Sequence, residues 1–325
     1  MIAPGGAAPV DIRPMEKADL PEADRVLRLA FGTRLRLPDP MKFRGDSEIL
    51  QPRLKTDPQT AFVAESAGRI IGSVIGMDWG RVFVLGPLSV DPSFAGRGIA
   101  RLLMRQSMAR ADAQGFDMAA LFTVPDSPTH IRLYESFGFV PNTLTPVMAK
   151  EVKSSDMPVP PAGAAGYRLY SGLSHGEREE ALKSCRDLAG AVFPGLDLSR
   201  EINAISAQSL GETLLLQGSS GTLAGFALCH MGNGSEAGSG VLFVKFAACN
   251  PGDPSSFGRL LDACADLARA KGIPRVTAGC NTSRQEAYDL MRDRGFRAQM
   301  IGVAMHRPNQ AGWNRPGMFV LDDWR

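Results

Sequence analysis

The feature that most constrains the fold is an internal repeat. Three pairs of landmarks share one spacing of 157 residues: Gly115 and Gly272, Gly138 and Gly295, and Met148 and Met305. The first glycine of the series follows a helix-like apolar pattern, the second begins a Gly-Phe pair, and the methionine belongs to an apolar run. One ungapped offset across three separated landmarks indicates a duplication, and its period is far too long for a solenoid. The chain is therefore expected to contain two copies of one fold.

The order of predicted elements supports two α/β copies, each with a mixed, largely antiparallel sheet flanked by helices. The first copy is expected to hold strands at 10–14, 61–65, 70–79, 81–90, 118–124 and 144–150, and helices at 18–31, 47–54, 98–114 and 127–137. The second is expected to hold strands at 167–170, 214–216, 224–230, 241–249, 275–279 and 300–306, and helices at 176–188, 254–270 and 284–294. The predicted boundaries are 1–152 and 167–325. Between them, 153–166 is rich in Pro, Ala, Gly and Ser and predicts a linker.

Composition excludes several classes of function. The 325 residues carry a net charge of only +2, with no basic run, so nucleic acid is not an expected partner. No stretch of 18 apolar residues predicts a membrane span, and the N-terminus lacks the features of a signal peptide. The five cysteines are odd in number and lack CxxC spacing, which favours reduced, buried thiols, a cytoplasmic location and no metal site.

The stretch from Leu85 to Met104 indicates an anion site. An apolar strand ends at Val90, a short loop holds Gly96 and Gly98, and an apolar-periodic helix follows. This arrangement presents unpaired backbone N–H groups to a phosphate, and Arg97 adds a positive charge. Earlier in the strand, Gly86-Pro87 is expected to break the pairing, because proline donates no hydrogen bond and glycine marks a bulge.

Three segments carry a family resemblance: Leu88-Ser-Val-Asp-Pro92, Ala95-Gly-Arg-Gly-Ile-Ala100 and Leu133-Tyr-Glu-Ser-Phe-Gly-Phe139. They resemble the GCN5-related N-acetyltransferase (GNAT) superfamily, whose loop pattern is Gln/Arg-x-x-Gly-x-Gly/Ala. The resemblance implies that acetyl-CoA is the cosubstrate. It further implies that the residues holding acetyl-CoA are Leu88, Ser89, Val90, Ala95, Gly96, Arg97, Gly98, Ile99, Ala100, Ser127 and Tyr134. Ala95 stands where the family has Gln or Arg, and Ser127 where it often has Asn.

The resemblance also implies direct attack of an amine on the thioester, with Tyr134 as the general acid that protonates the leaving thiolate. No cysteine precedes Cys185, so the first copy cannot form a cysteinyl acyl-enzyme. The general base is left open among Glu65, Asp78, Asp126 and His130. Of these, His130 lies four residues before Tyr134 and hence on the same helix face.

The second copy is expected to have lost the ligand. The uniform offset replaces Gly96 by Asp253, Gly98 by Ser255 and Tyr134 by Met291. A carboxylate at the anion position repels a pyrophosphate. We therefore expect one functional and one degenerate copy, with the aromatic segment from Trp313 to Trp324 docked on a domain or on a partner.

Three hypotheses about function follow. The first is acetylation of a small-molecule amine. The second is acetylation of a protein lysine or N-terminus, and the third is a non-catalytic CoA-binding regulatory module. A homodimer is left open, and the acceptor is not readable from the region 32–60, whose charges form no pattern.

Overall fold

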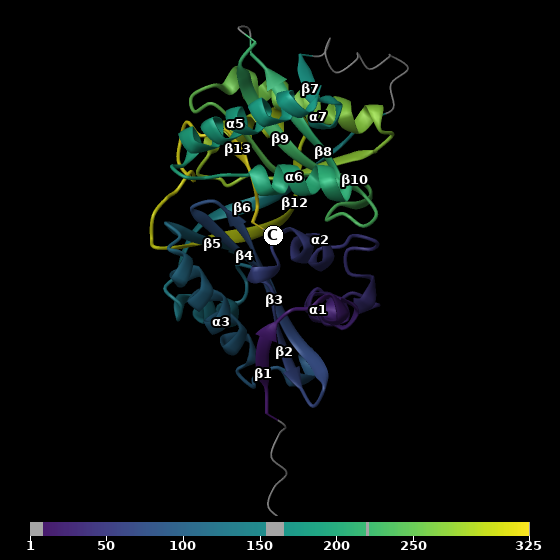
Figure 1. Cartoon of the computed structure of the whole chain (residues 1–325), viewed down its shortest axis with the longest axis vertical. Coiled ribbons are helices and arrows are strands. Elements are labelled where there is room, and N and C mark those ends of the chain that lie inside the picture. The colour runs from purple at the N-terminus through teal and green to yellow at the C-terminus, as the bar shows by residue number, and fades with distance from the viewer. Residues whose placement is uncertain (1–8, 154–165, 219–220, 325) are drawn as a thin grey trace, which may run out of the picture.

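A single sheet runs through the whole molecule. The computed structural model describes residues 9–153, 166–218 and 221–324. We call 9–153 the first repeat and 166–324 the second. The strands follow the order β1-β2-β3-β4-β5-β12-β6-β11-β10-β9-β8-β7, with β13 added beside β10 (Figure 1). The predicted linker at 153–166 lies almost wholly outside the described residues.

The elements of the two repeats follow the same order. The first repeat contains β1 (Asp11–Pro14), α1 (Leu20–Arg34), α2 (Leu50–Thr56), β2 (Phe62–Ser66), β3 (Arg69–Trp79), β4 (Val82–Val90), α3 (Ile99–Gln114), β5 (Met118–Thr123), α4 (Pro128–Glu135) and β6 (Val140–Glu151). The second contains β7 (Tyr167–Leu169), α5 (His175–Val192), α6 (Ser199–Gln208), β8 (Gly211–Gln217), β9 (Leu223–Gly232), β10 (Gly238–Cys249), α7 (Pro254–Ala270), β11 (Arg275–Gly279), α8 (Gln285–Asp293), β12 (Arg297–Arg307) and β13 (Val320–Leu321). The predicted fold class is thus confirmed.

The two repeats exchange their last long strands. Strand β12 of the second repeat lies between β5 and β6, and β6 of the first repeat lies between β12 and β11. Consequently the fifth strand of each repeat pairs with the sixth strand of the other, β5 with β12 and β11 with β6. The repeat in the sequence did not predict this exchange, because a sequence period carries no information about which copy of a strand completes which half.

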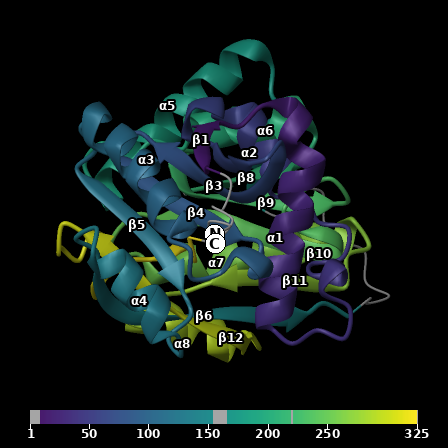
Figure 2. The same cartoon turned by 90° about the horizontal axis from the view of Figure 1, so that it is seen from below.

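Helices cover both faces of the sheet. In the first repeat, Ala64 and Ile71 pack with α3, whereas Val63 and Ile70 on the same strands pack with α1 and α2. This alternation follows from the period of two along a strand. Figure 2 shows α1 and α3 on opposite sides of the strands.

The largest core cluster belongs to both repeats. It joins Trp79, Val84 and Met118 of the first repeat to Leu188 and Phe246 of the second. Because apolar side chains of both repeats are buried in the same cluster, separating the repeats would expose it to water.

Several element boundaries differ from the prediction. Helix α6 has no counterpart in the predicted set, although Leu198, Ile202 and Ile205 lie at helical spacing and are buried. Strand β6 begins four residues earlier than predicted, because its first residues pair with β12 of the other repeat. The cysteines are confirmed as buried and unbridged. Among the described residues, no helix has the length and apolarity that crossing a bilayer requires.

Candidate active site

The site begins where β4 and β5 part. These strands pair in parallel only from Val82 to Leu85, opposite Met118 to Leu121. On its other edge, β4 carries one extra residue relative to β3 between Leu85 and Leu88. The predicted bulge at Gly86-Pro87 is therefore confirmed. Beyond Leu85 the two strands no longer pair, and we call the stretch between their unpaired segments the first groove.

The groove is edged by backbone groups of β4. The N–H of Asp91 donates to the carbonyl of Ile71 on β3 at 2.9 Å. Because hydrogen-bonding directions alternate along a strand, Val90 and Leu88 turn their N–H and C=O groups away from β3 and toward the groove. The backbone N–H and C=O groups of Ser89 point toward β3, where Ser89 lies opposite Ser73. The hydroxyl groups of these two serines lie 3.0 Å apart. Two of the three predicted strand residues thus have backbone available to a ligand.

The glycine loop presents unpaired donors at the end of this groove. Gly98 is the N-cap of α3 with φ of +79°, and Gly96 has φ of +76°. Within the described residues, the backbone N–H groups from Gly96 to Arg101 have no acceptor. A Cβ at either glycine would meet open space. The loop therefore leaves a cradle of N–H groups open at a helix N-terminus, which suits a phosphate group.

The side chains around the loop hold its shape. Asp91 accepts hydrogen bonds from the N–H of Ser93 at 3.0 Å and from its hydroxyl at 2.6 Å. The Arg97 guanidinium lies 4.9 Å from the centre of the Phe94 ring, and Arg97 is exposed to solvent. Arg97 is thus placed to add positive charge beside the cradle, whereas Ala95 is exposed and contributes no polar side chain.

Helix α4 carries Tyr134 to the open end of β5. The tyrosine is half-buried, and its ring packs edge-on against Phe139 with centroids 6.4 Å apart. Its side chain hydrogen-bonds that of Thr123, the last residue of β5. Burial raises the pKa of Tyr134 to about 12, and the Thr123 hydrogen bond opposes part of that rise. The phenol is therefore protonated at neutral pH. Ser127 caps α4, accepting from the His130 N–H at 3.5 Å.

The candidate bases lie in different places. Glu65 is held by Arg13 at 2.8 Å on the β1–β2 edge, and Asp78 is held by Arg200 of the second repeat at 3.1 Å. Neither is brought to Tyr134. The remaining pair, Asp126 and His130, lies near α4.

Asp126 and His130 share a neighbour in Arg34, at the end of α1. Asp126 pairs with Arg34 at 2.7 Å and is largely exposed. Burial lowers the pKa of His130, and Arg34 lowers it further, so the imidazole is neutral at pH 7. A neutral imidazole one helical turn from Tyr134 keeps His130 a candidate for accepting a proton.

Comparison with known proteins agrees with this geometry. The model of the acetyltransferase (GNAT) family matches residues 29–139, which include the splayed strands, the glycine loop and Tyr134. The part of the chain that holds the candidate site thus resembles the GNAT family.

Individual relatives cover different parts of this chain. A mycothiol acetyltransferase of Thermobispora bispora is 34% identical over 93 residues, which are 26% of this chain and 30% of that protein. The chain spans less than two thirds of the length of each curated relative it matches. A structure of an acetyltransferase from Pyrococcus horikoshii, described as putative, covers 97% of this chain and 95% of its own at TM-score 0.69 and 14% identity. The structure of a tandem GNAT protein from the clavulanic acid biosynthesis pathway covers 92% of this chain and 98% of its own. Its TM-score is 0.52 and its sequence identity is 13%.

The second repeat lacks the cradle of N–H groups seen in the first. Its corresponding helix, α7, is capped by Asp253, whose carboxylate accepts from the N–H of Ser256 at 2.9 Å. When the paired ends of β4 and β10 are aligned, Cys249 corresponds to Val90. The loop is then two residues shorter, since Gly115 lies 25 positions after Val90 but Gly272 lies only 23 positions after Cys249. Helix position thus matches Gly98 to Asp253, rather than to Ser255 as the uniform offset predicts. In both alignments the second repeat has no glycine at the anion position.

A buried charge network joins the second repeat to the bulge of the first. Arg53 on α2 donates from Nη1 to the Gly86 carbonyl at 2.5 Å, and from Nε and Nη2 to both oxygens of Glu236. Lys245 donates to Glu236 at 2.8 Å and to Glu201 at 2.9 Å. All four charged side chains are at most 6% exposed. No local pattern signals this network, because Glu236 lies in a Gly/Ser-rich turn 183 residues after Arg53.

His230 lies against this network, and its buried imidazole should make the stability of the protein depend on pH. Its Nδ1 accepts from the Glu236 N–H at 3.4 Å, and burial lowers its pKa to about 4, with Lys245 and Arg53 opposing protonation. A base with a depressed folded pKa loses stability as pH falls from its unfolded pKa, about 6.5, toward 4. We expect the unfolding free energy to fall by about 3 kcal/mol across that window. Urea unfolding at pH 7, 5.5 and 4 measures this loss.

The matched control for that loss is His230→Gln. The pKa of the buried His306 is also lowered, so it contributes to the slope in the same window. Subtracting the His230→Gln curve from the wild-type curve isolates His230. Parallel curves would show that folding does not lower the pKa of His230.

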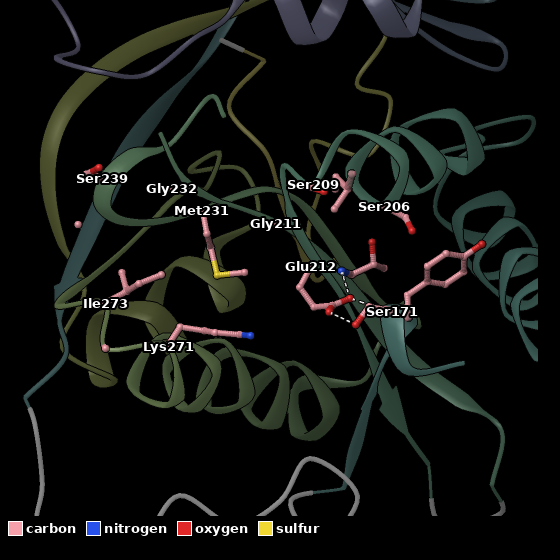
Figure 3. Close-up of a pocket in the computed structure, with 15 residues that line it drawn as sticks. Ser171, Ser206, Ser209, Gly211, Glu212, Met231, Gly232, Ser239, Lys271 and Ile273 are labelled. Atoms are coloured by element: carbon pink, nitrogen blue, oxygen red, sulfur yellow. Dashed lines mark hydrogen bonds between the residues drawn. The ribbon is translucent and has the colours of Figure 1, made fainter. Parts of the chain in front are cut away.

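A separate cavity of about 670 Å³ lies in the second repeat, at the ends of β8, β9 and β10 (Figure 3). Its Glu212 carboxylate accepts from the Ser171 N–H and hydroxyl and from the Thr213 N–H. Because these internal donors already occupy Glu212, we assign no chemistry to this cavity.

Proposed function

We propose that the first repeat transfers an acetyl group from acetyl-CoA to the amine of a small molecule by direct attack. The observation that carries this proposal is the cradle of unpaired N–H groups from Gly96 to Arg101, continuous with the groove beside β4. Backbone of Val90 and Leu88 would hold the amide groups of the pantetheine arm as an added strand does. Residues 1–152 would form the catalytic copy and 167–325 the degenerate one.

Tyr134 would act on the leaving sulfur. A thiol has a pKa of about 8.5, so complete transfer of the Tyr134 proton to a thiolate is uphill by about 5 kcal/mol. Tyr134 would therefore first stabilise the sulfur as a hydrogen-bond donor, and its proton would follow late in the step. His130, neutral and one turn away, is the better placed of the candidate bases to take the proton of the incoming ammonium.

A small acceptor is favoured by what covers the bulge. Arg53 closes the α2 side of Gly86 and is itself held by Glu236 of the second repeat. Arg34 and Asp126 also join the end of α1 to the segment before α4. These contacts would leave less room for a peptide acceptor than for a small amine. One relative is also named after a small molecule, as a mycothiol acetyltransferase.

The test is a thiol-release assay with acetyl-CoA and a panel of amino acids, aminoglycosides, polyamines and peptides. We expect acetylation of at least one small amine and none of the peptides. Acetylation of peptides alone would show that the acceptor is a protein or peptide and not a small molecule. Tight binding of acetyl-CoA without transfer to any member would favour a regulatory module.

Replacing Tyr134 by Phe should separate chemistry from binding. The variant keeps the ring that packs on Phe139 and removes the donor to sulfur, so kcat should fall by about 100-fold. The Kd for acetyl-CoA should stay within about threefold, since most contacts are to backbone. Steady-state kinetics and calorimetry measure the two quantities.

The control for that variant is Tyr288→Phe on α8, the corresponding helix of the second repeat. It should leave kcat unchanged. Equal losses in the two variants, or none in Tyr134→Phe, would remove Tyr134 from the mechanism.

A further inference from the structure

The second repeat retains the splayed strands of the first. Its β10 and β11 pair in parallel only from Val241 to Val244, opposite Arg275 to Ala278. Strand β10 also carries one extra residue relative to β9 at Lys245, between Val244 and Phe246. Bulge and separation therefore recur in the same order, and the second repeat has a groove of its own.

A segment of the same chain fills this second groove. Strand β13 pairs antiparallel with β10, with Leu321 opposite Ala247 and Val320 opposite Ala248. The N–H of Cys249 donates to the carbonyl of Phe319 at 3.0 Å. On the other side, the N–H of Asp322 donates to the carbonyl of Gly279 on β11 at 3.1 Å. The segment is thus hydrogen-bonded to both of the strands that part.

The register places this segment where the first repeat has its ligand groove. Aligning the paired ends of the two β strands puts Ala247 and Cys249 at the positions of Leu88 and Val90. The segment also passes the shortened loop, because the Gly252 N–H donates to the Gly317 carbonyl at 2.9 Å. It therefore runs from the anion position toward the bulge, along the path that we propose for acetyl-CoA in the first repeat.

The fit of this segment is that of a core element. Phe319, Val320 and Leu321 are at most 1% exposed. Asp322 pairs at 3.0 Å with Arg284, which is fully buried, and also accepts from the Trp313 indole N–H. Gly279 leaves the space that the segment uses, since a Cβ there would lie 2.2 Å from the Asp323 Cβ.

We propose that the second groove is a peptide-binding site whose ligand is the segment 317–322 of the same chain, so that the protein binds one acetyl-CoA per chain. The stoichiometry of one acetyl-CoA rests on the proposed function of the first repeat. The occupancy of the second groove is independent of that proposal. Burial of Phe319 and Leu321 and the pairing of Asp322 with Arg284 hold the segment, and the Asp253 carboxylate at the loop keeps phosphates out.

The experiment uses the full chain with a specific protease site inserted between Arg315 and Pro316, both exposed. After cutting, the released segment should remain bound through gel filtration and the melting temperature should change little. A labelled synthetic peptide of residues 316–324 should exchange into the cut protein. The same peptide with Val320→Asp should bind at least 100-fold more weakly, because a carboxylate would enter the buried strand, and a scrambled peptide should not exchange.

Two outcomes would overturn the proposal. Loss of the segment on cutting without a change in melting temperature would show that it is not a ligand of the groove. Calorimetric binding of two acetyl-CoA molecules to the uncut chain would show that the groove is open. Binding of no acetyl-CoA would instead contradict the proposed function, while retention of the segment would still report on the second groove.

Discussion

Replacing Gly98 by Glu should abolish measurable binding of acetyl-CoA. Gly98 holds φ of +79°, which a side chain adopts only with strain, and a carboxylate there would face the phosphate position. Two unit charges about 4 Å apart repel by about 4 kcal/mol at an effective dielectric near 20. We therefore expect the Kd measured by calorimetry to rise by at least 100-fold. The backbone strain of about 1–2 kcal/mol should lower the melting temperature by only a few degrees, so the protein stays folded in the binding assay.

The matched control is Ser255→Glu at the start of α7, where the residue is also exposed. An added carboxylate in the first turn of that helix suits the helix dipole. The control should bind acetyl-CoA as the unmodified protein does. Equal losses in both variants would contradict the assignment of the cosubstrate to the first repeat alone.

Replacing Arg53 by Met should lower both stability and activity. The change leaves Glu236 buried and paired only with Lys245, and breaking a buried ion pair in this way costs about 3–5 kcal/mol. For a chain of this size each kcal/mol lowers the melting temperature by about 2–4 °C, so a fall of about 10 °C is expected by calorimetry. Because the Arg53 hydrogen bond to the Gly86 carbonyl is also lost, kcat/KM should fall further than the folded fraction does.

Two further variants interpret that result. The double variant Arg53→Met with Glu236→Gln should recover part of the stability, since it removes both charges together. Arg275→Met removes an ion pair with Glu151 in which both side chains are largely exposed, and it should change the unfolding free energy by less than about 0.5 kcal/mol. A loss no larger for Arg53→Met than for Arg275→Met would show that the network contributes nothing specific.

Sequence reasoning predicted the local features of the site. Gly86-Pro87, Gly96 and Gly98 each constrain the backbone by their own chemistry, so a bulge and a helix entry follow from residue type and spacing. The duplication was visible because one offset survives from the α3 helix onward. The docking of the aromatic segment on a domain was also predicted and is confirmed by β13.

The long-range features were not predicted, for physical reasons. The contact of Arg53 with Glu236 depends on the fold of two repeats, and no pattern within either segment reports it. The counterpart of Gly98 was misplaced by two residues because the loop of the second repeat is shorter. The occupied groove was missed because Phe319–Leu321 reads only as a short apolar run; its partner strand is known once β10 and β11 are seen to part.

The exchanged strands carry a record of symmetry. In the β6–β12 ladder, Arg297 lies opposite Ala149 and His306 lies opposite Val140. The offset of 157 makes Arg297 the counterpart of Val140 and His306 the counterpart of Ala149. Each of the two positions therefore lies opposite the other position in the partner repeat, which is the pattern of an isologous, twofold contact. The two repeats thus contact each other as the subunits of a homodimer do, but within one polypeptide. Because they are covalently linked, their association is intramolecular and does not depend on protein concentration. Such a molecule can let one half lose its ligand while the other keeps it, a freedom that two identical subunits never have.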